Sequence, residues 1–221
     1  MDGLLIVDKP RGVSSFNVIR DVRKKYGIRA VGHIGTLDPE ASGVLPILVG
    51  KATKLSDLLM LHDKDYIAEI TLGIKTDSGD IEGNIIERDD SNHNYDKNQI
   101  LTVLNSFKGH SKQIPPMYSA IKIDGKKLYE LARNGKSVER EERDIFIENI
   151  ELLDFDGKII KYKVTCSKGT YIRVLSENIA EKLGTVGFMS SLRRTRVGNF
   201  KIEDAEKFIK IEDILDVEKI E

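Results

Sequence analysis

Asp38 is well placed for chemistry, because it precedes a proline in a segment that resists regular structure. Residues 32–43 read G-H-I-G-T-L-D-P-E-A-S-G. Glycine opens positive φ angles and proline removes a backbone donor, so these residues predict a shaped loop. Pro39 biases Asp38 towards an extended backbone, which aims its carboxylate from a fixed position. A carboxylate held in this way can act as a nucleophile or as a general base.

The same residues also permit structural interpretations. An Asp-Pro pair is common in turns that have no catalytic role. His33 lies upstream in the same loop, and an isolated histidine is more often a satisfied structural residue than a catalytic one. From the residue types alone, both alternatives stay open.

The elements before the loop must position it. Residues 3–8 form an apolar run that ends at Lys9-Pro10 and predicts a buried strand. Ser14 or Ser15 can cap a helix that runs to about Tyr26 and ends at Gly27. We interpret Lys9 and Pro10 as structural supports of the Asp38 loop.

The rest of the chain mixes strands with helices. The patterns predict helices at 53–61, before 107, and at 126–134, 174–183 and 204–215. They predict a strand at 66–72 that pairs with a second strand at 81–87, and a further strand at 192–200. They also predict a hairpin with strands on both sides of the Asp156-Gly157 turn. Residues 44–49 form an apolar run. We therefore expect an α+β fold with a mixed, largely antiparallel sheet and flanking helices. No linker is evident, which predicts a single domain over residues 1–221.

Composition excludes several classes of site. The single cysteine, Cys166, excludes an intramolecular disulfide and a thiolate cluster, and the four histidines are widely spread. We therefore expect no metal site. No apolar run approaches the length of a membrane span and no secretory leader begins the chain, so we expect a cytoplasmic protein without membrane contact.

The charges are segregated although the net charge is only −1. Residues 108–138 carry seven basic and two acidic residues, whereas residues 61–107 carry four basic and ten acidic ones. If the basic segments share one face, a polyanion could dock there. The alternative is that each segment is simply a solvated surface.

Six blocks of sequence, in order along the chain, resemble the TruB family of tRNA pseudouridine synthases. K-P-R-G-V-S-S at 9–15 is the first, and the Asp38 loop followed by L-P-I-L-V-G-K-A-T-K at 45–54 is the second. The others are K-D-Y at 64–66, I-P-P-M-Y-S-A-I-K-I-D-G-K-K-L-Y-E-L-A-R at 114–133, C-S-K-G-T-Y-I-R at 166–173 and S-L-R-R-T-R-V-G at 191–198. The resemblance implies the pseudouridine synthase catalytic fold and isomerisation of uridine 55 in the T-loop of tRNA. It implies no cofactor.

The resemblance also implies roles for individual residues. Asp38 matches the essential aspartate and Arg173 the arginine that pairs with it. Tyr66 and Tyr171 match the pocket tyrosines, although core tyrosines in strands give the same pattern. Leu192 matches a residue that lines the uracil slot, and His33 one that contacts the substrate.

Basic residues outside these positions are candidates for contacts with the phosphates of the tRNA T-arm. They are Lys122, Lys126, Lys127, Arg193, Arg194 and Arg196. Replacing Arg193 and Arg194 is expected to flatten the salt dependence of binding.

Two further expectations concern organisation and function. Bacterial members of the family usually carry a C-terminal RNA-binding domain of the PUA type, and the sequence predicts its absence here. We expect a monomer. The alternative function is an RNA-binding or tRNA-folding factor whose catalysis is incidental.

Overall fold

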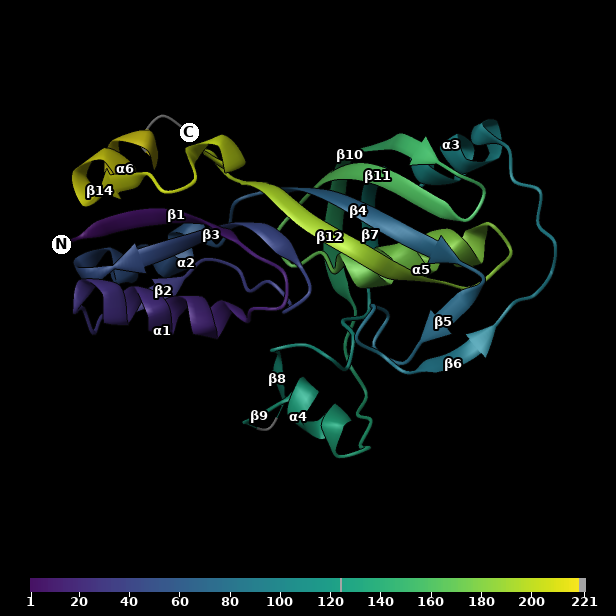
Figure 1. The fold of residues 1–221 in the computed structure, drawn as a ribbon, viewed down its shortest axis with the longest axis horizontal. Coiled ribbons are helices and arrows are strands. Elements are labelled where there is room, and N and C mark those ends of the chain that lie inside the picture. The colour runs from purple at the N-terminus through teal and green to yellow at the C-terminus, as the bar shows by residue number, and fades with distance from the viewer. Residues whose placement is uncertain (124, 219–221) are drawn as a thin grey trace. The chain divides into compact units, whose positions relative to one another are not determined.

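The computed structural model of the protein describes residues 1–123 and 125–218. Its contacts divide the chain into a first unit, Met1–Ile67 with Leu192–Glu221, and a second unit, Ala68–Ser191. Each unit combines strands with helices (Figure 1). The expected α+β class is therefore confirmed, whereas the expectation of one catalytic domain without a PUA-type domain stays a prediction.

The boundaries of the elements are as follows. The helices are α1 (Ser15–Tyr26), α2 (Ser56–Leu59), α3 (Lys97–Asn105), α4 (Leu128–Arg133), α5 (Ile172–Lys182) and α6 (Ile211–Glu218), with the 3₁₀ helices η1 (Gly50–Leu55) and η2 (Ile202–Asp204). The strands are β1 (Gly3–Lys9), β2 (Val31–His33), β3 (Ser42–Val49), β4 (Lys64–Leu72), β5 (Ile74–Thr76), β6 (Ile85–Arg88), β7 (Gly109–Gln113), β8 (Lys122–Ile123), β9 (Lys126–Lys127), β10 (Arg143–Phe155), β11 (Ile159–Cys166), β12 (Gly187–Val197), β13 (Phe200–Lys201) and β14 (Phe208–Lys210).

In the first unit, β1 lies between β14 and β3 and pairs antiparallel with both. Its apolar run predicted a buried strand, and this is confirmed: Leu4 and Ile6 are fully buried and pack in one cluster with Val44 and Leu48 of β3. The β1–β3 register ends at the pair Lys9↔Gly43. The two strands therefore bring Lys9 beside the end of the Asp38 loop.

Helix α1 follows its predicted signals closely. The Ser14 side chain accepts a hydrogen bond from Asn17 N at 3.1 Å and caps the first turn. Gly27 ends the helix with a φ of 67°, a conformation that glycine adopts without a Cβ penalty. Val18 and Val22 lie on the buried face, and the helix packs against β2, below β1 and β3 in the view of Figure 1.

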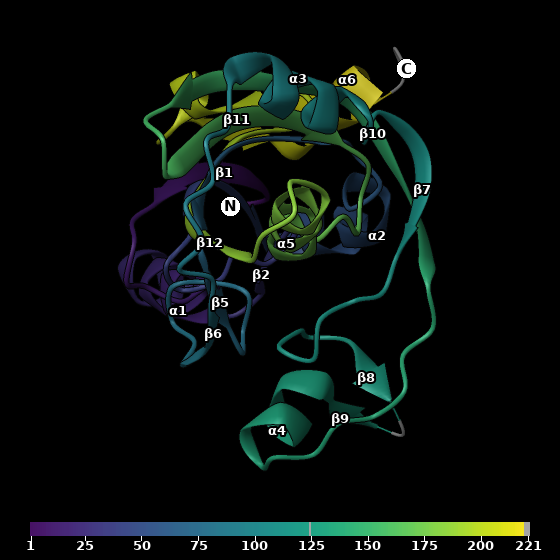
Figure 2. The same ribbon diagram turned by 90° about the vertical axis from the view of Figure 1, so that its right-hand side faces the viewer.

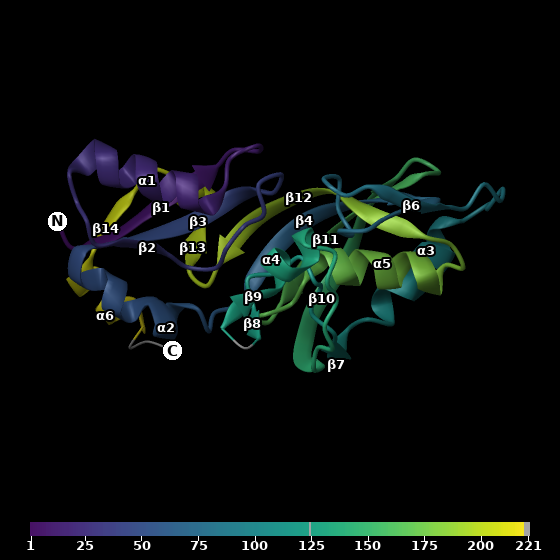
Figure 3. The ribbon, with the colours of Figure 1, turned by 90° about the horizontal axis from the view of Figure 1, so that it is seen from below.

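In the second unit, the predicted hairpin around Asp156 is confirmed. The Asp156 carboxylate accepts from the backbone N–H groups of Lys158 at 2.9 Å and Ile159 at 2.7 Å, and these two bonds lower its pKa. Tyr162 of β11 is fully buried, and its hydroxyl lies 2.9 Å from Ser176 Oγ of α5. Helix α3 lies over β10 and α5 lies on the other side of β10 and β11 (Figures 2 and 3).

Two small sheets complete the second unit. Strand β5 pairs with β6, and β8 pairs with β9 just before α4. The segment β8–β9–α4 stands away from β10 and β11 at the ends of β7 and β10 (Figure 2). Lys122 and Lys126 are exposed on this segment.

Two predictions of secondary structure are wrong. Residues 81–87 do not pair with 66–72, because β6 pairs with β5 and the neighbours of β4 are β12 and β11. Residues 204–215 do not form one helix, since η2 is followed by β14 and α6 begins only at Ile211. Contacts with distant strands decide both cases, and local patterns do not report them.

Other predictions need revised boundaries. The loop predicted at 32–43 is shorter, because β2 ends at His33 and β3 begins at Ser42. Strand β3 runs through Pro46, whose carbonyl accepts from Ile34 N at 3.0 Å. The strand predicted at 192–200 begins earlier, at Gly187, and ends at Val197. Within the described residues, no helix is long and apolar enough to span a membrane.

Candidate catalytic site

The Asp38 loop connects β2 to β3 and leaves Asp38 half-buried. The Asp38 carbonyl accepts from Ala41 N at 3.1 Å, which closes a turn around Pro39. Gly35 has a φ of 69°, in the left-handed region. The predicted shaped loop is therefore present between the strands, and its backbone geometry requires the glycine.

Both neighbours of Asp38 are held by buried side chains. On one side, Ser15 Oγ donates to Leu37 O at 2.9 Å and accepts from Leu37 N at 3.0 Å. On the other side, Lys9 Nζ donates to Pro39 O at 3.0 Å, and to Val13 O at 2.6 Å. Lys9 is 0% exposed. The interpretation of Lys9 as a support of the loop is confirmed.

Arg194 lies beneath the loop and is 1% exposed. Its guanidinium donates from Nε to Val44 O at 2.8 Å and from Nη2 to Gly35 O at 2.9 Å. It also hydrogen-bonds the Tyr66 side chain, and burial lowers its pKa. The expected phosphate contact by Arg194 is wrong, because its guanidinium is committed to groups in the interior.

Two glycines permit this close packing. A Cβ added at Gly43 would lie 2.0 Å from Arg194 O, because β3 and β12 pair in parallel with Gly43 opposite Arg194. A Cβ at Gly35 would lie 3.1 Å from Arg194 Nη1 and 3.5 Å from Lys64 Cε. The glycines of this loop therefore let the backbone approach a buried arginine.

Tyr66, Leu192 and His33 belong to the same unit as Asp38. Tyr66 lies on β4 and is 7% exposed, and Leu192 on β12 is 8% exposed. His33 is half-buried, and burial together with the Arg194 charge lowers its pKa, so its imidazole is neutral at neutral pH. Its Nδ1 is buried and has no hydrogen-bond partner among the described residues.

Tyr171 and Arg173 lie in the second unit, at the start of α5. Gln113 holds Tyr171 by two bonds, since its Nε2 donates to Tyr171 O at 3.1 Å and its Oε1 accepts from Tyr171 N at 2.7 Å. The Arg173 guanidinium donates to Tyr118 O at 2.6 Å and to Ser78 O at 3.2 Å. Hydrogen bonds therefore hold the backbone of Tyr171 and the side chain of Arg173 at the start of α5.

Asp80 is the carboxylate that accompanies Arg173 in this unit. The nearest atoms, Arg173 Nη1 and Asp80 Oδ2, lie 3.5 Å apart, and the two side chains are 6% and 8% exposed. Ser78 Oγ also donates to Asp80 Oδ1 at 2.6 Å. Burial raises the pKa of Glu177, whose carboxyl packs against Gly79. The sequence predicted no role for Asp80, and this contact was missed because Asp80 and Arg173 lie far apart along the chain.

Comparison with known proteins decides the family. Residues 23–172 match the model described as "TruB family pseudouridylate synthase (N terminal domain)". Residues 173–220 match the model of the tRNA pseudouridylate synthase B C-terminal domain. The chain belongs to the TruB family.

Curated TruB relatives align along nearly the whole chain. tRNA pseudouridine synthase B of Clostridium tetani is 48% identical over 214 residues, which is 97% of this chain and 73% of the relative. The protein of the same name from Bacillus subtilis is 48% identical over 217 residues, 96% of this chain and 70% of the relative.

Solved structures support the fold. A chain of a Cbf5-Nop10-Gar1 complex is 32% identical with a TM-score of 0.72, and the match covers 97% of this chain and 54% of that one. A chain of an H/ACA RNP bound to a substrate RNA containing 2'-deoxyuridine is 28% identical with a TM-score of 0.68, over 97% of this chain and 52% of that one. This chain therefore spans about half the length of these solved chains.

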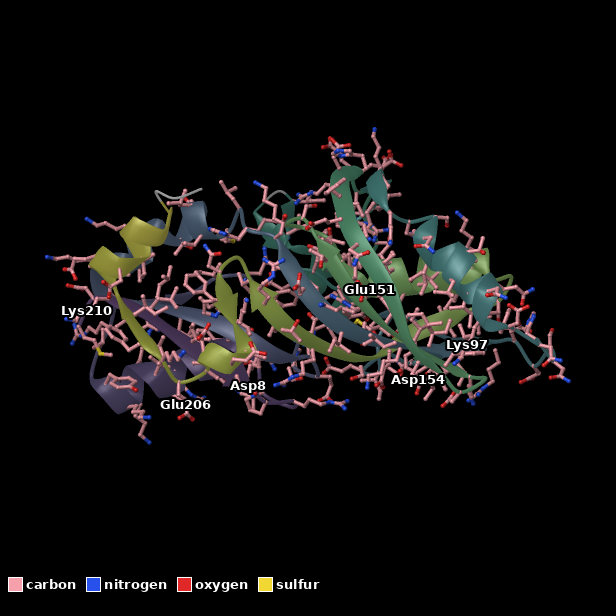
Figure 4. All side chains as sticks on the ribbon, turned by 90° about the horizontal axis from the view of Figure 1, so that it is seen from above. Asp8, Lys97, Glu151, Asp154, Glu206 and Lys210 are labelled. Atoms are coloured by element: carbon pink, nitrogen blue, oxygen red, sulfur yellow. The ribbon has the colours of Figure 1, made fainter. Side chains whose placement is uncertain are left out.

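The remaining basic candidates of this TruB chain fall into two groups. Arg193 is paired with Asp8 at 2.8 Å and Arg196 with Asp65 at 2.7 Å. Figure 4 labels Asp8, which lies on β1. In contrast, Lys122 and Lys126 on β8 and β9 have exposed side chains. The lysines are the better candidates for phosphate contacts, because Arg193 and Arg196 would first have to leave a carboxylate.

Lys127 belongs to neither the paired arginines nor the exposed lysines. It is half-buried, and its Nζ donates to Tyr129 OH at 3.3 Å. Its proposed contact with RNA, like the roles of Asp38, Arg173 and the pocket residues, stays a prediction. Within the described residues, no group of three or more His, Cys, Asp or Glu side chains could hold a metal ion.

Proposed function

We propose that this chain is a tRNA pseudouridine synthase that isomerises uridine 55 in the T-loop of tRNA, with Asp38 as the catalytic carboxylate. The observation that carries the proposal is the fixed Asp38 loop. Leu37 and Pro39 are both tied to buried side chains, so the carboxylate between them projects from a backbone with little freedom. Membership of the TruB family supplies the reaction.

The reaction rearranges bonds within a single nucleotide. The N1–C1′ bond breaks, the uracil turns, and a C5–C1′ bond forms, while C5 loses a proton and N1 gains one. No electrons and no groups are exchanged with a second molecule. The chemistry therefore requires a carboxylate near the ribose, a slot for the detached base, and a uridine removed from its stack.

Asp38 must be ionised whether it attacks C1′ or removes a proton from the sugar. Desolvation by a bound nucleotide would favour its neutral form, so a cation is needed nearby. We propose that Arg173 pairs with Asp38 for this purpose, because its guanidinium stays charged at any working pH.

The remaining pocket residues would hold the everted uridine. Stacking on Tyr66 or Tyr171 contributes roughly 1–3 kcal/mol per base, which helps to offset the few kcal/mol that unstacking costs. Leu192 would line the uracil slot. The neutral, half-buried His33 imidazole would contact the T-loop. We propose that the protein acts as a monomer in the cytoplasm and needs no cofactor.

The wild-type chain tests this proposal directly. With tRNA labelled with tritium at C5 of uridine, purified protein is expected to release tritium to water, and mapping is expected to place pseudouridine at position 55. Tritium release at background from folded protein would contradict the proposed activity. Release with pseudouridine at another position would contradict only the specificity.

Exposed lysines of β8 and β9 are expected to contribute to tRNA binding. Each phosphate contact contributes roughly 0.7–0.9 to the slope of log K against log salt concentration, so K122A/K126A should flatten the slope by about 1.5. The slope is measured from the Kd of tRNA at several salt concentrations. Lys97→Ala is the control, because Lys97 is also exposed in the second unit (Figure 4) but begins α3 in the acidic part of the chain. Equal slopes for K122A/K126A and Lys97→Ala would show that Lys122 and Lys126 do not contact the tRNA phosphates.

A further inference from the structure

Ser15 makes a contact that its position in α1 does not explain. It is the first residue of the helix and is 3% exposed. Its hydroxyl donates to Leu37 O at 2.9 Å and accepts from Leu37 N at 3.0 Å. One hydroxyl thus satisfies both backbone groups of the residue before Asp38.

The neighbouring serine shows the contrast. Ser14 caps α1 by accepting from Asn17 N at 3.1 Å, so it serves the helix. Ser15 bonds instead to a residue 22 positions further along the chain. The two adjacent serines therefore have different roles: Ser14 caps the N-terminus of the helix, and Ser15 joins the helix to the loop.

Helix α1 is itself well packed, so its Ser15 can hold the Leu37 peptide groups in place. Val18, Ile19 and Val22 bury its inner face, and Leu37 itself is 3% exposed. Without the Ser15 hydroxyl, the N–H and C=O of Leu37 would be left buried without these partners, and the loop would have to move to satisfy them.

We infer that Ser15 is a positioning residue for Asp38: its hydroxyl fixes the Leu37 peptide groups and so sets where the Asp38 carboxylate points. The inference rests on the proposed function. Lys9 holds the other side through Pro39 O, so loss of Ser15 releases the Leu37 peptide groups while Pro39 stays held. A displacement of about 1 Å in a reacting group can lower a rate by roughly 10²-fold.

The test compares Ser15→Ala with Ser14→Ala. Ser15→Ala is expected to lower the single-turnover rate of pseudouridine formation about 10- to 100-fold, with the Kd of tRNA unchanged within about twofold. Ser14→Ala should lower the Tm by about 2–4 °C through loss of the cap, with a rate within about twofold of wild type. Amide exchange at Leu37 should speed up in Ser15→Ala alone.

A wild-type rate for Ser15→Ala would overturn the inference, as would an equal fall in rate for Ser14→Ala, because the effect would then follow stability alone. If Ser15→Ala does not fold, Ser15→Cys replaces it, since a thiol is similar in size but a weaker hydrogen-bond donor. Its rate should also fall, and a wild-type rate would overturn the inference. Inactive wild-type protein would instead contradict the proposed function.

Discussion

Asp38→Asn is expected to lower pseudouridine formation by roughly 10⁴-fold or more, while tRNA binding is retained. An amide is neutral and cannot act as a nucleophile or accept a proton at neutral pH, so the variant lacks the group on which the reaction depends. The asparagine side chain has the same shape, and the hydrogen bonds that hold Leu37 and Pro39 remain. The loss should therefore appear in the single-turnover rate, measured by tritium release, and not in the Kd of tRNA.

Glu40→Gln is the matched control for this variant. Glu40 lies in the same loop, but its carboxylate is paired with Arg11 at 3.3 Å and both side chains are partly exposed. Exposed pairs of this kind contribute little to stability, so the control should keep the wild-type rate. An active Asp38→Asn variant would remove Asp38 from the catalytic step.

Asp38→Asn also distinguishes the two functions that the sequence allowed. If the protein acts as a synthase, cells that carry only Asp38→Asn lose pseudouridine at position 55 and show the phenotype of that loss. If it acts as a tRNA-folding factor with incidental catalysis, the same cells lose pseudouridine but keep the normal phenotype. Binding alone does not distinguish the two, since both functions retain it.

The elements that could be predicted carry their signals locally. Helix α1 has a cap at Ser14 and a left-handed Gly27 at its end, and the β10–β11 hairpin turns at Asp156, whose side chain bonds the next residues of the turn. Strand β14 has no such signal. It exists because it pairs with β1, more than 190 residues away in the register Leu5↔Phe208, and a local pattern does not report such a partner.

In the candidate site, too, local features could be predicted from the sequence and contacts between distant segments could not. The Asp38 loop could be predicted because glycine permits positive φ angles and proline fixes φ and removes a backbone donor. The role of Arg194 was missed, because three arginines in one segment, 193–196, resemble an RNA-binding surface. Alternation along a strand contained the needed signal: Leu192 and Arg194 occupy positions i and i+2, which share a face, and both are buried. The contacts of Ser15 with Leu37 and of Asp80 with Arg173 join distant segments and leave no trace in the spacing.

Arg173→Met is expected to lower the free energy of unfolding by about 3–5 kcal/mol, since it leaves the buried Asp80 carboxylate without its cation. It also removes the donors to Ser78 O and Tyr118 O, two carbonyls that the guanidinium binds at 3.2 Å and 2.6 Å. Urea unfolding followed by circular dichroism measures the loss. Arg143→Met is the control, because Arg143 is exposed at the start of β10, and surface substitutions usually change stability by about 0.5 kcal/mol or less.

A double-mutant cycle with Asp80→Asn assigns the cause of this loss. Asp80→Asn removes the charge but keeps a group that can bond Ser78 Oγ, so the variant should lose less stability than Arg173→Met. In D80N/R173M the stranded carboxylate is absent, and the double variant should lose less than the sum of the single variants, by about 0.5–3 kcal/mol. Strict additivity would show that Arg173 stabilises the unit through the two carbonyls and not through Asp80. In that case the start of α5 would be held mainly by the hydrogen bonds from the Arg173 guanidinium to Ser78 O and Tyr118 O.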